Sequence, residues 1–93
     1  MKIVLKINNE DKTFVAPFVS ARRLKDTFAL SKKIEKGFDE NVLDEVGTYL
    51  VNVYGKQFTL DQLYDGLPAN AFINKAVEDM QEVIGNFDNV VKN

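Results

Sequence analysis

Four carboxylates are clustered in a short segment of the chain, at Asp39, Glu40, Asp44 and Glu45. Carboxylates at this density could bind a divalent cation or act as an acid–base pair, because both tasks need several oxygen atoms that converge within a few ångströms. Their spacing does not match a calcium-binding loop, in which ligands alternate and a central glycine makes the turn. Because the helix dipole alone favours acidic residues at a helix N-terminus, we interpret the cluster as the solvated start of a helix.

Other side chains that commonly do chemistry are missing from the sequence. There is no cysteine and no histidine, so a thiolate zinc site, a cysteine nucleophile and a histidine general base are impossible. The five glycines are scattered singly, and no glycine-rich loop is present to bind phosphate. We therefore predict a protein that is not an enzyme and that has no cofactor and no metal site.

The net charge is only −2, but the charges are unevenly distributed. Residues 20–36 contain six basic residues against two acidic ones, whereas residues 37–93 contain ten acidic residues against three lysines. The basic segment of one subunit could face the acidic segments of the next, and such a head-to-tail contact propagates into rings or spirals. A monomer with an uneven surface fits the charges equally well. The predicted contact residues of the basic segment are Arg22, Arg23, Lys32 and Lys33.

Nucleic acid is a second possible partner of the basic segment, because clustered lysine and arginine release counterions from phosphate. Two features argue against this interpretation. The rest of the chain is acidic and would repel a long polyanion. In addition, no aromatic residue is interleaved with the basic residues to stack on bases. Binding of nucleic acid is therefore the less favoured alternative.

A third group of candidates is apolar and aromatic, and consists of Tyr54, Phe58, Tyr64 and Leu67. They flank a short predicted helix, where aromatic residues more often cover the core than bind a ligand. We favour a core position for them. Any that prove exposed would be natural anchors for an apolar segment of a partner, since aromatic residues dominate binding hot spots.

The N-terminal segment predicts a β-hairpin. Ile3, Leu5 and Ile7 alternate with other residues at the period of a strand with one buried face, which predicts a strand over residues 2–7. Residues 8–11, Asn-Asn-Glu-Asp, predict a turn, and the β-branched and aromatic residues that follow predict a second strand over residues 12–16, ended by Pro17. A lone hairpin is marginal in water, so it must pack on the rest of the chain.

Four helices are predicted after the hairpin. The first covers about residues 20–35, and the second begins near residue 39 and ends at Gly55. The third covers residues 60–65 and the fourth residues 68–84. Ser20 and Thr59 are the predicted N-caps of the first and third, and Gln62 completes a capping box with Thr59. Two sets of residues could form the buried face of the first helix. One set is Ala21, Leu24, Phe28 and Ser31, and the other is Leu30 and Ile34. The inward stripe of the last helix includes Phe72, Val77 and Met80.

These elements define an α+β fold, because strands and helices do not alternate. A chain of 93 residues supports one core, so we predict a single domain over residues 1–86 and a flexible C-terminal tail over residues 87–93. No apolar run approaches the roughly 20 residues that a membrane-spanning helix needs, and lysines interrupt the apolar start of the chain. We therefore predict no membrane association and a cytoplasmic location.

Several stretches of the chain, taken together, resemble one protein family. Residues 1–8, 14–22 and 52–67 carry the likeness, above all the segments Ala-Pro-Phe-Val-Ser-Ala-Arg at 16–22 and Gln-Phe-Thr-Leu-Asp-Gln-Leu-Tyr-Asp-Gly-Leu at 57–67. Over about residues 1–86 the chain is similar to the tail assembly chaperones of long-tailed, siphovirus-type phages and prophages of Gram-positive bacteria.

The resemblance implies a protein that coats the tape measure protein in multiple copies during tail morphogenesis and keeps it soluble until tail tube subunits displace the coat. It implies that the protein is absent from the mature virion. It also implies a longer form, made by ribosomal frameshifting, that recruits the tail tube protein, with this chain as the shorter form. The alternative, from the basic segment alone, is a small nucleic-acid-binding or regulatory protein of a mobile element.

Overall fold

The chain begins with an antiparallel hairpin of β1 (Lys2–Ile7) and β2 (Glu10–Val15) in the computed structural model, which describes residues 1–85. Asn8 and Asn9 have φ angles of 54° and 65°, a left-handed conformation that asparagine tolerates. β1 has the bounds that the alternation predicts. β2 starts two residues earlier than predicted, because the two-residue turn places Glu10 directly opposite Ile7.

Four helices follow, as predicted: α1 (Ala21–Lys36), α2 (Glu40–Val53), α3 (Leu60–Gly66) and α4 (Ala69–Ile84). Local hydrogen bonds explain two of their starts. The carboxylate of Asp39 accepts a hydrogen bond of 2.9 Å from the backbone N–H of Val42, and Thr59 and Gln62 form the predicted capping box. Ser20 occupies the N-cap position of α1, but its side chain makes no capping hydrogen bond. The fold is thus the predicted α+β arrangement of a hairpin and four helices.

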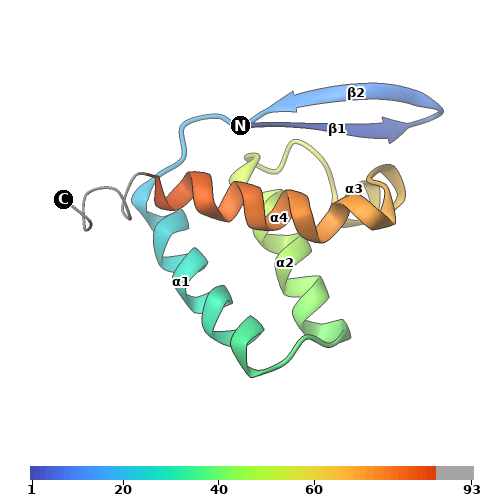
Figure 1. Cartoon of the computed structure of the whole chain (residues 1–93). Coiled ribbons are helices and arrows are strands. Elements are labelled where there is room, and N and C mark those ends of the chain that lie inside the picture. Colours follow the sequence, from blue (N-terminus) through green and yellow to red (C-terminus); the bar gives the residue numbers. More distant parts are fainter. Residues whose placement is uncertain (86–93) are drawn as a thin grey trace.

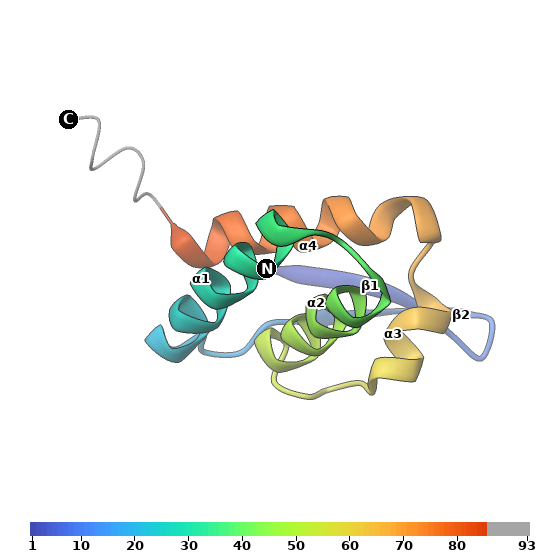
Figure 2. The same cartoon turned by 90° about the horizontal axis from the view of Figure 1, so that it is seen from below.

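The hairpin lies along one side of the helices, with β1 nearer to them than β2 (Figure 1). The helices α1 and α2 point away from the hairpin, and α4 runs across them. In the view from below, α4 follows one side of this group of helices (Figure 2). The last residue of α3, Gly66, touches the backbone of β1, since a Cβ atom added there would lie 2.8 Å from the carbonyl oxygen of Lys6. The hairpin is therefore held directly against α3.

The core lies between β1 and the helices. Ile3 and Leu5 of β1 are buried, as the alternation predicts, and Leu50 of α2 is fully buried. The other buried apolar residues are Leu30, Val42, Val46, Tyr49, Val53, Tyr54, Phe58, Leu63, Phe72, Ala76 and Met80.

Two predicted apolar stripes are only partly correct. In α1 the second alternative is right, because Leu30 is buried and Ile34 partly buried, whereas Phe28 is 47% exposed and Ala21 is exposed. In α4 the side chain of Val77 is 45% exposed, and Asp79 takes a fully buried position instead. Both helices are thus rotated relative to the stripe that apolar residues alone indicate.

Hydrogen bonds to buried hydroxyl groups explain why polar side chains can be buried in this core. The Tyr54 hydroxyl donates a hydrogen bond of 2.7 Å to Asp79, and the ammonium of Lys75 donates one of 3.0 Å to the same carboxylate. The hydroxyls of Thr27 and Tyr49 are hydrogen-bonded at 2.6 Å and link α1 to α2. Burial raises the pKa of Tyr54 and of Tyr49, and hydrogen bonding to the Asp79 carboxylate raises that of Tyr54 further.

The raised pKa of Tyr54 predicts a loss of stability in alkali. Below pH 10, the ordinary tyrosine value, the phenol is neutral in both states. Above pH 10 it ionises in the unfolded chain but stays protonated in the fold, so the free energy of unfolding falls by up to about 1.4 kcal/mol per pH unit for this residue. Urea unfolding between pH 9 and about pH 11 measures the slope. Tyr54→Phe should flatten the slope, and an unchanged slope would contradict this assignment.

Candidate interaction surfaces

The acidic residues around the start of α2 have structural partners. Asp39 caps the helix, and the carboxylate of Asp44 accepts a hydrogen bond from the Tyr64 hydroxyl. Glu45 forms an ion pair with Lys33 of α1. Within residues 1–85 no three carboxylates are close enough together to hold a metal ion. Asp44 and Glu45 therefore join α2 to α3 and to α1.

The first candidate surface is the basic face of α1. At 3.6 residues per turn, Arg22, Lys25, Lys32, Lys33 and Lys36 lie within about a third of the helix circumference, and all five are exposed. Lys33 is engaged by Glu45, whereas Arg22 and Lys32 form no ion pair with any of residues 1–85. Of the four predicted basic contact residues, these two are free to meet a partner.

Arg23, the remaining predicted basic contact residue, lies off this face. Its side chain is only 21% exposed and forms an ion pair of 3.3 Å with Asp26. The half-exposed Phe28 lies next to the basic face instead, because it precedes Lys32 by about one turn. Phe28, which one of the two predicted stripes placed inward, thus lies exposed at the edge of the basic face.

The four apolar candidates separate into two pairs. Tyr54 and Phe58 are 0% and 3% exposed, and the Phe58 ring packs 5.1 Å from that of Phe14, so this pair has the core position favoured from the sequence. Because they are buried, they offer no surface to a partner. Tyr64 and Leu67 are partly buried at a surface depression between α2, α3 and α4.

We call this depression the α2–α4 groove. Its volume is about 260 Å³, and Tyr64 and Phe72 form its aromatic wall with ring centroids 5.7 Å apart. Burial raises the pKa of Tyr64 to about 12, with a further contribution from the Asp44 carboxylate, so the phenol stays a neutral donor to that carboxylate. The groove is lined by Leu43, Tyr64, Leu67, Ala69, Phe72 and Ile73.

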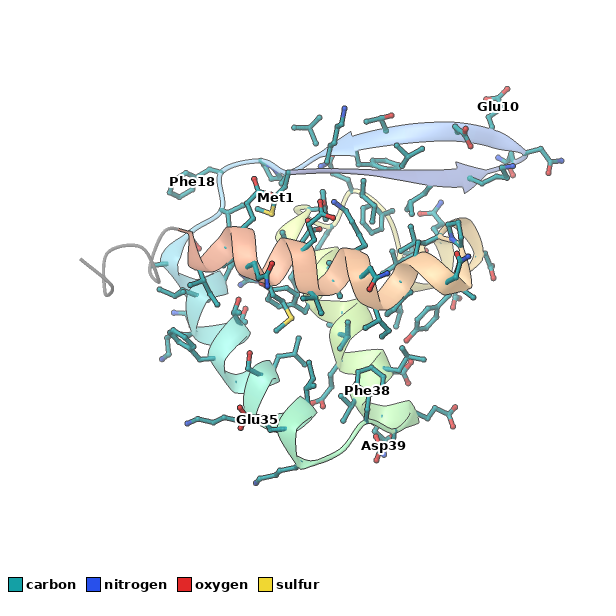
Figure 3. The ribbon with its side chains drawn as sticks, in the orientation of Figure 1. Met1, Glu10, Phe18, Glu35, Phe38 and Asp39 are labelled. Atoms are coloured by element: carbon teal, nitrogen blue, oxygen red, sulfur yellow. The ribbon has the colours of Figure 1, made fainter. Side chains whose placement is uncertain are left out.

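A further exposed residue was missed from the sequence. Phe18, in the segment between β2 and α1, is 90% exposed and projects from the molecule (Figure 3). A signal was available, because Phe18 lies between Pro17 and the N-cap residue Ser20 and therefore outside both the strand period and the helix period. A phenylalanine this exposed is unusual in a soluble domain, where large apolar side chains are mostly buried.

The comparison with protein families decides the identity. The family described as phage tail chaperone protein matches residues 1–93, the whole chain. The chain belongs to this phage tail chaperone family. No curated protein and no solved structure matched it.

Membership confirms the family resemblance at the level of a phage tail assembly chaperone. The tail chaperone family is one of non-enzymatic assembly proteins, and its partners are tail proteins in general. None of the helices within residues 1–85 is long and apolar enough to cross a membrane. Within residues 1–85, the candidate contact surfaces described above are the basic face of α1, the α2–α4 groove and the projecting Phe18.

Proposed function

We propose that this tail chaperone binds and coats the tape measure protein of a long-tailed phage in multiple copies, in the cytoplasm of the host. The coat keeps the long tape measure protein soluble until tail tube subunits replace it. A longer, frameshifted form of the chain would help to recruit those tail tube subunits. We further propose a phage or prophage of Gram-positive bacteria as its source, from the segments at residues 16–22 and 57–67.

The family match over the whole chain is the observation that carries this proposal. Exposed apolar groups on separate elements support it, because a chaperone that solubilises an apolar helix must present apolar surface of its own. Such groups are Phe18 and Phe28, 90% and 47% exposed, and the groove residue Ile73, 43% exposed. Reversible coating needs no catalytic group and benefits from weak, charge-steered contacts such as those of the basic α1 face.

Co-expression with the tape measure protein of the same phage or prophage tests the proposal. The partner should become soluble and co-purify with several copies of the chaperone, and native mass spectrometry of the complex would count them. An insoluble partner, or a complex with a single copy, would refute multi-copy coating. The same partner expressed alone is the control for its intrinsic solubility.

Reversing two unpaired cations of α1 should weaken the coat. With Arg22→Glu and Lys32→Glu together, we expect roughly a tenfold or greater drop in the amount of soluble complex at physiological salt, because both side chains are exposed and form no ion pair with residues 1–85. The matched control reverses Lys2 and Lys12 of the hairpin, which changes the net charge equally. Equal yields from the two variants would show that the basic face makes no specific contact.

Binding of nucleic acid is the second candidate function, because the exposed Phe28 lies beside the basic face. A protein that uses this face on phosphates would be retained on DNA and released steeply by salt. Retention on a DNA column that vanishes in the Arg22→Glu, Lys32→Glu variant would favour it. We expect no such retention, because residues 37–93 carry a large excess of acidic groups.

A further inference from the structure

Phe18 lies at a basic end of the molecule. The depression beside it is lined by Phe18 and by the segment that follows β2, together with part of the loop after α2. Among residues 1–85, the charged residues that line it are Arg23 and Lys56, and the exposed Arg22 is the second residue of α1. A partner that receives the Phe18 ring therefore needs an apolar depression with acidic surroundings.

The α2–α4 groove has these properties. The two helices that supply Leu43 and Tyr64, α2 and α3, contain five acidic residues and no lysine or arginine. Its volume of about 260 Å³ exceeds the roughly 150 Å³ of an apolar cavity that accommodates a benzene molecule. The groove can thus receive a phenyl ring, and the charge around it is opposite to the charge around Phe18.

A single molecule cannot bring the two features together. Phe18 is near the start of α1, whereas α3 and the first turns of α4 lie at the other end of the molecule (Figures 1 and 3). Phe18 is 90% exposed and Ile73 is 43% exposed, so both side chains are open within the part of the chain that the structure describes.

We propose that Phe18 of one copy inserts into the α2–α4 groove of a second copy. This inference rests on the proposed multi-copy function and names a contact that would hold neighbouring copies together. The contact joins two different surfaces, so each copy keeps one free Phe18 or one free groove after pairing. Head-to-tail contacts of this kind continue into a ring or a spiral rather than ending at a dimer.

Two single variants test the contact, one on each side of it. Phe18→Ser removes the inserted ring, and Ile73→Lys places a positive charge in the groove, where it opposes the basic surroundings of Phe18. Each variant alone should self-associate roughly thirtyfold or more weakly than the parent, the effect expected for a binding hot spot. The controls are Phe28→Ser on α1, where the ring is 47% exposed, and Val77→Lys on α4, where the apolar side chain is 45% exposed, close to the 43% of Ile73. Neither control residue lines the groove.

Mixing the two variants gives the decisive result. Phe18→Ser retains an intact groove and Ile73→Lys retains an intact Phe18, so an equimolar mixture should form a one-to-one dimer and nothing larger. Sedimentation velocity measures the masses, and circular dichroism confirms that each variant folds. The contact is overturned if the mixture stays monomeric, if either variant assembles like the parent, or if the parent itself is monomeric at millimolar concentration.

The test of the Phe18 contact and the test of tape measure binding can fail independently of each other. If the parent solubilises the tape measure protein but Phe18→Ser assembles normally, the contact is wrong and the chaperone function stands. If the dimer forms on mixing but the parent leaves the tape measure protein insoluble, the contact stands and the proposed function is wrong.

Discussion

Replacing Asp79 with alanine should lower the free energy of unfolding by about 3 kcal/mol, the lower end of the effect of breaking a buried ion pair. The carboxylate is 0% exposed and accepts hydrogen bonds from the Tyr54 hydroxyl and the Lys75 ammonium. Its removal leaves a buried hydroxyl without a partner and a cation that is only 18% exposed. The cost stays at the lower end because Lys75 also lies 3.9 Å from Glu78.

Urea denaturation of the Asp79→Ala variant measures this loss. Glu78→Ala is the matched control, because its side chain is 71% exposed on the same helix and its removal should change stability by at most about 0.5 kcal/mol. The double variant with Tyr54→Phe should be less destabilised than the sum of the two single variants, since it leaves no orphaned hydroxyl. Equal losses for the Asp79 and Glu78 variants would show that the buried carboxylate contributes nothing specific.

Gly66→Ala should destabilise the fold by about 2–3 kcal/mol, through overpacking between α3 and β1. The added Cβ would lie 2.8 Å from the Lys6 carbonyl oxygen and 3.1 Å from the Lys6 backbone nitrogen. Both are backbone atoms of a paired strand, so the strand and not a side chain would have to move. We expect the hairpin to separate from α3, which hydrogen exchange of the β1 amides would detect.

Gly47→Ala is the informative comparison for this prediction. There the added Cβ would approach Leu60 Cδ1 at 2.5 Å, but that atom is the end of a flexible side chain that can change rotamer. Alanine is also preferred over glycine inside a helix by about 1 kcal/mol. The loss at Gly47 should therefore be clearly smaller than the loss at Gly66. The reverse order would mean that the contact of α3 with β1 is not a rigid one.

Both predictions concern the scaffold that positions the proposed contact surfaces. Asp79 joins α4 to the end of α2 through Tyr54, and Gly66 allows α3 to approach the hairpin. In the α2–α4 groove, Leu67 directly follows Gly66 in the sequence and Tyr64 precedes it by two residues. A change that moves α3 would therefore also alter the groove, and variants meant to test binding are better placed at exposed positions such as Phe18 and Ile73.

The sequence by itself determined the features that depend on near neighbours in the chain. The alternation of Ile3, Leu5 and Ile7 defined β1, and the pairing of Thr59 with Gln62 defined the start of α3. The basic charge of α1 and the family resemblance at residues 16–22 and 57–67 could also be recognised from the sequence. The predicted tail at residues 87–93, and the last residue of the predicted domain, Asn86, lie outside the described residues.

Only the tertiary structure decided which residues face the core and which are exposed at the surface. Phe28 and Val77 fit an apolar stripe as well as Leu30 and Met80 do, but α1 and α4 turn toward Tyr49 and Tyr54, whose hydroxyls bind Thr27 and Asp79. Likewise Tyr54 and Phe58 became core while Tyr64 and Leu67 border a groove. The physical reason is that periodicity reports the shape of one segment, whereas burial depends on segments that are distant in the chain and meet only after folding.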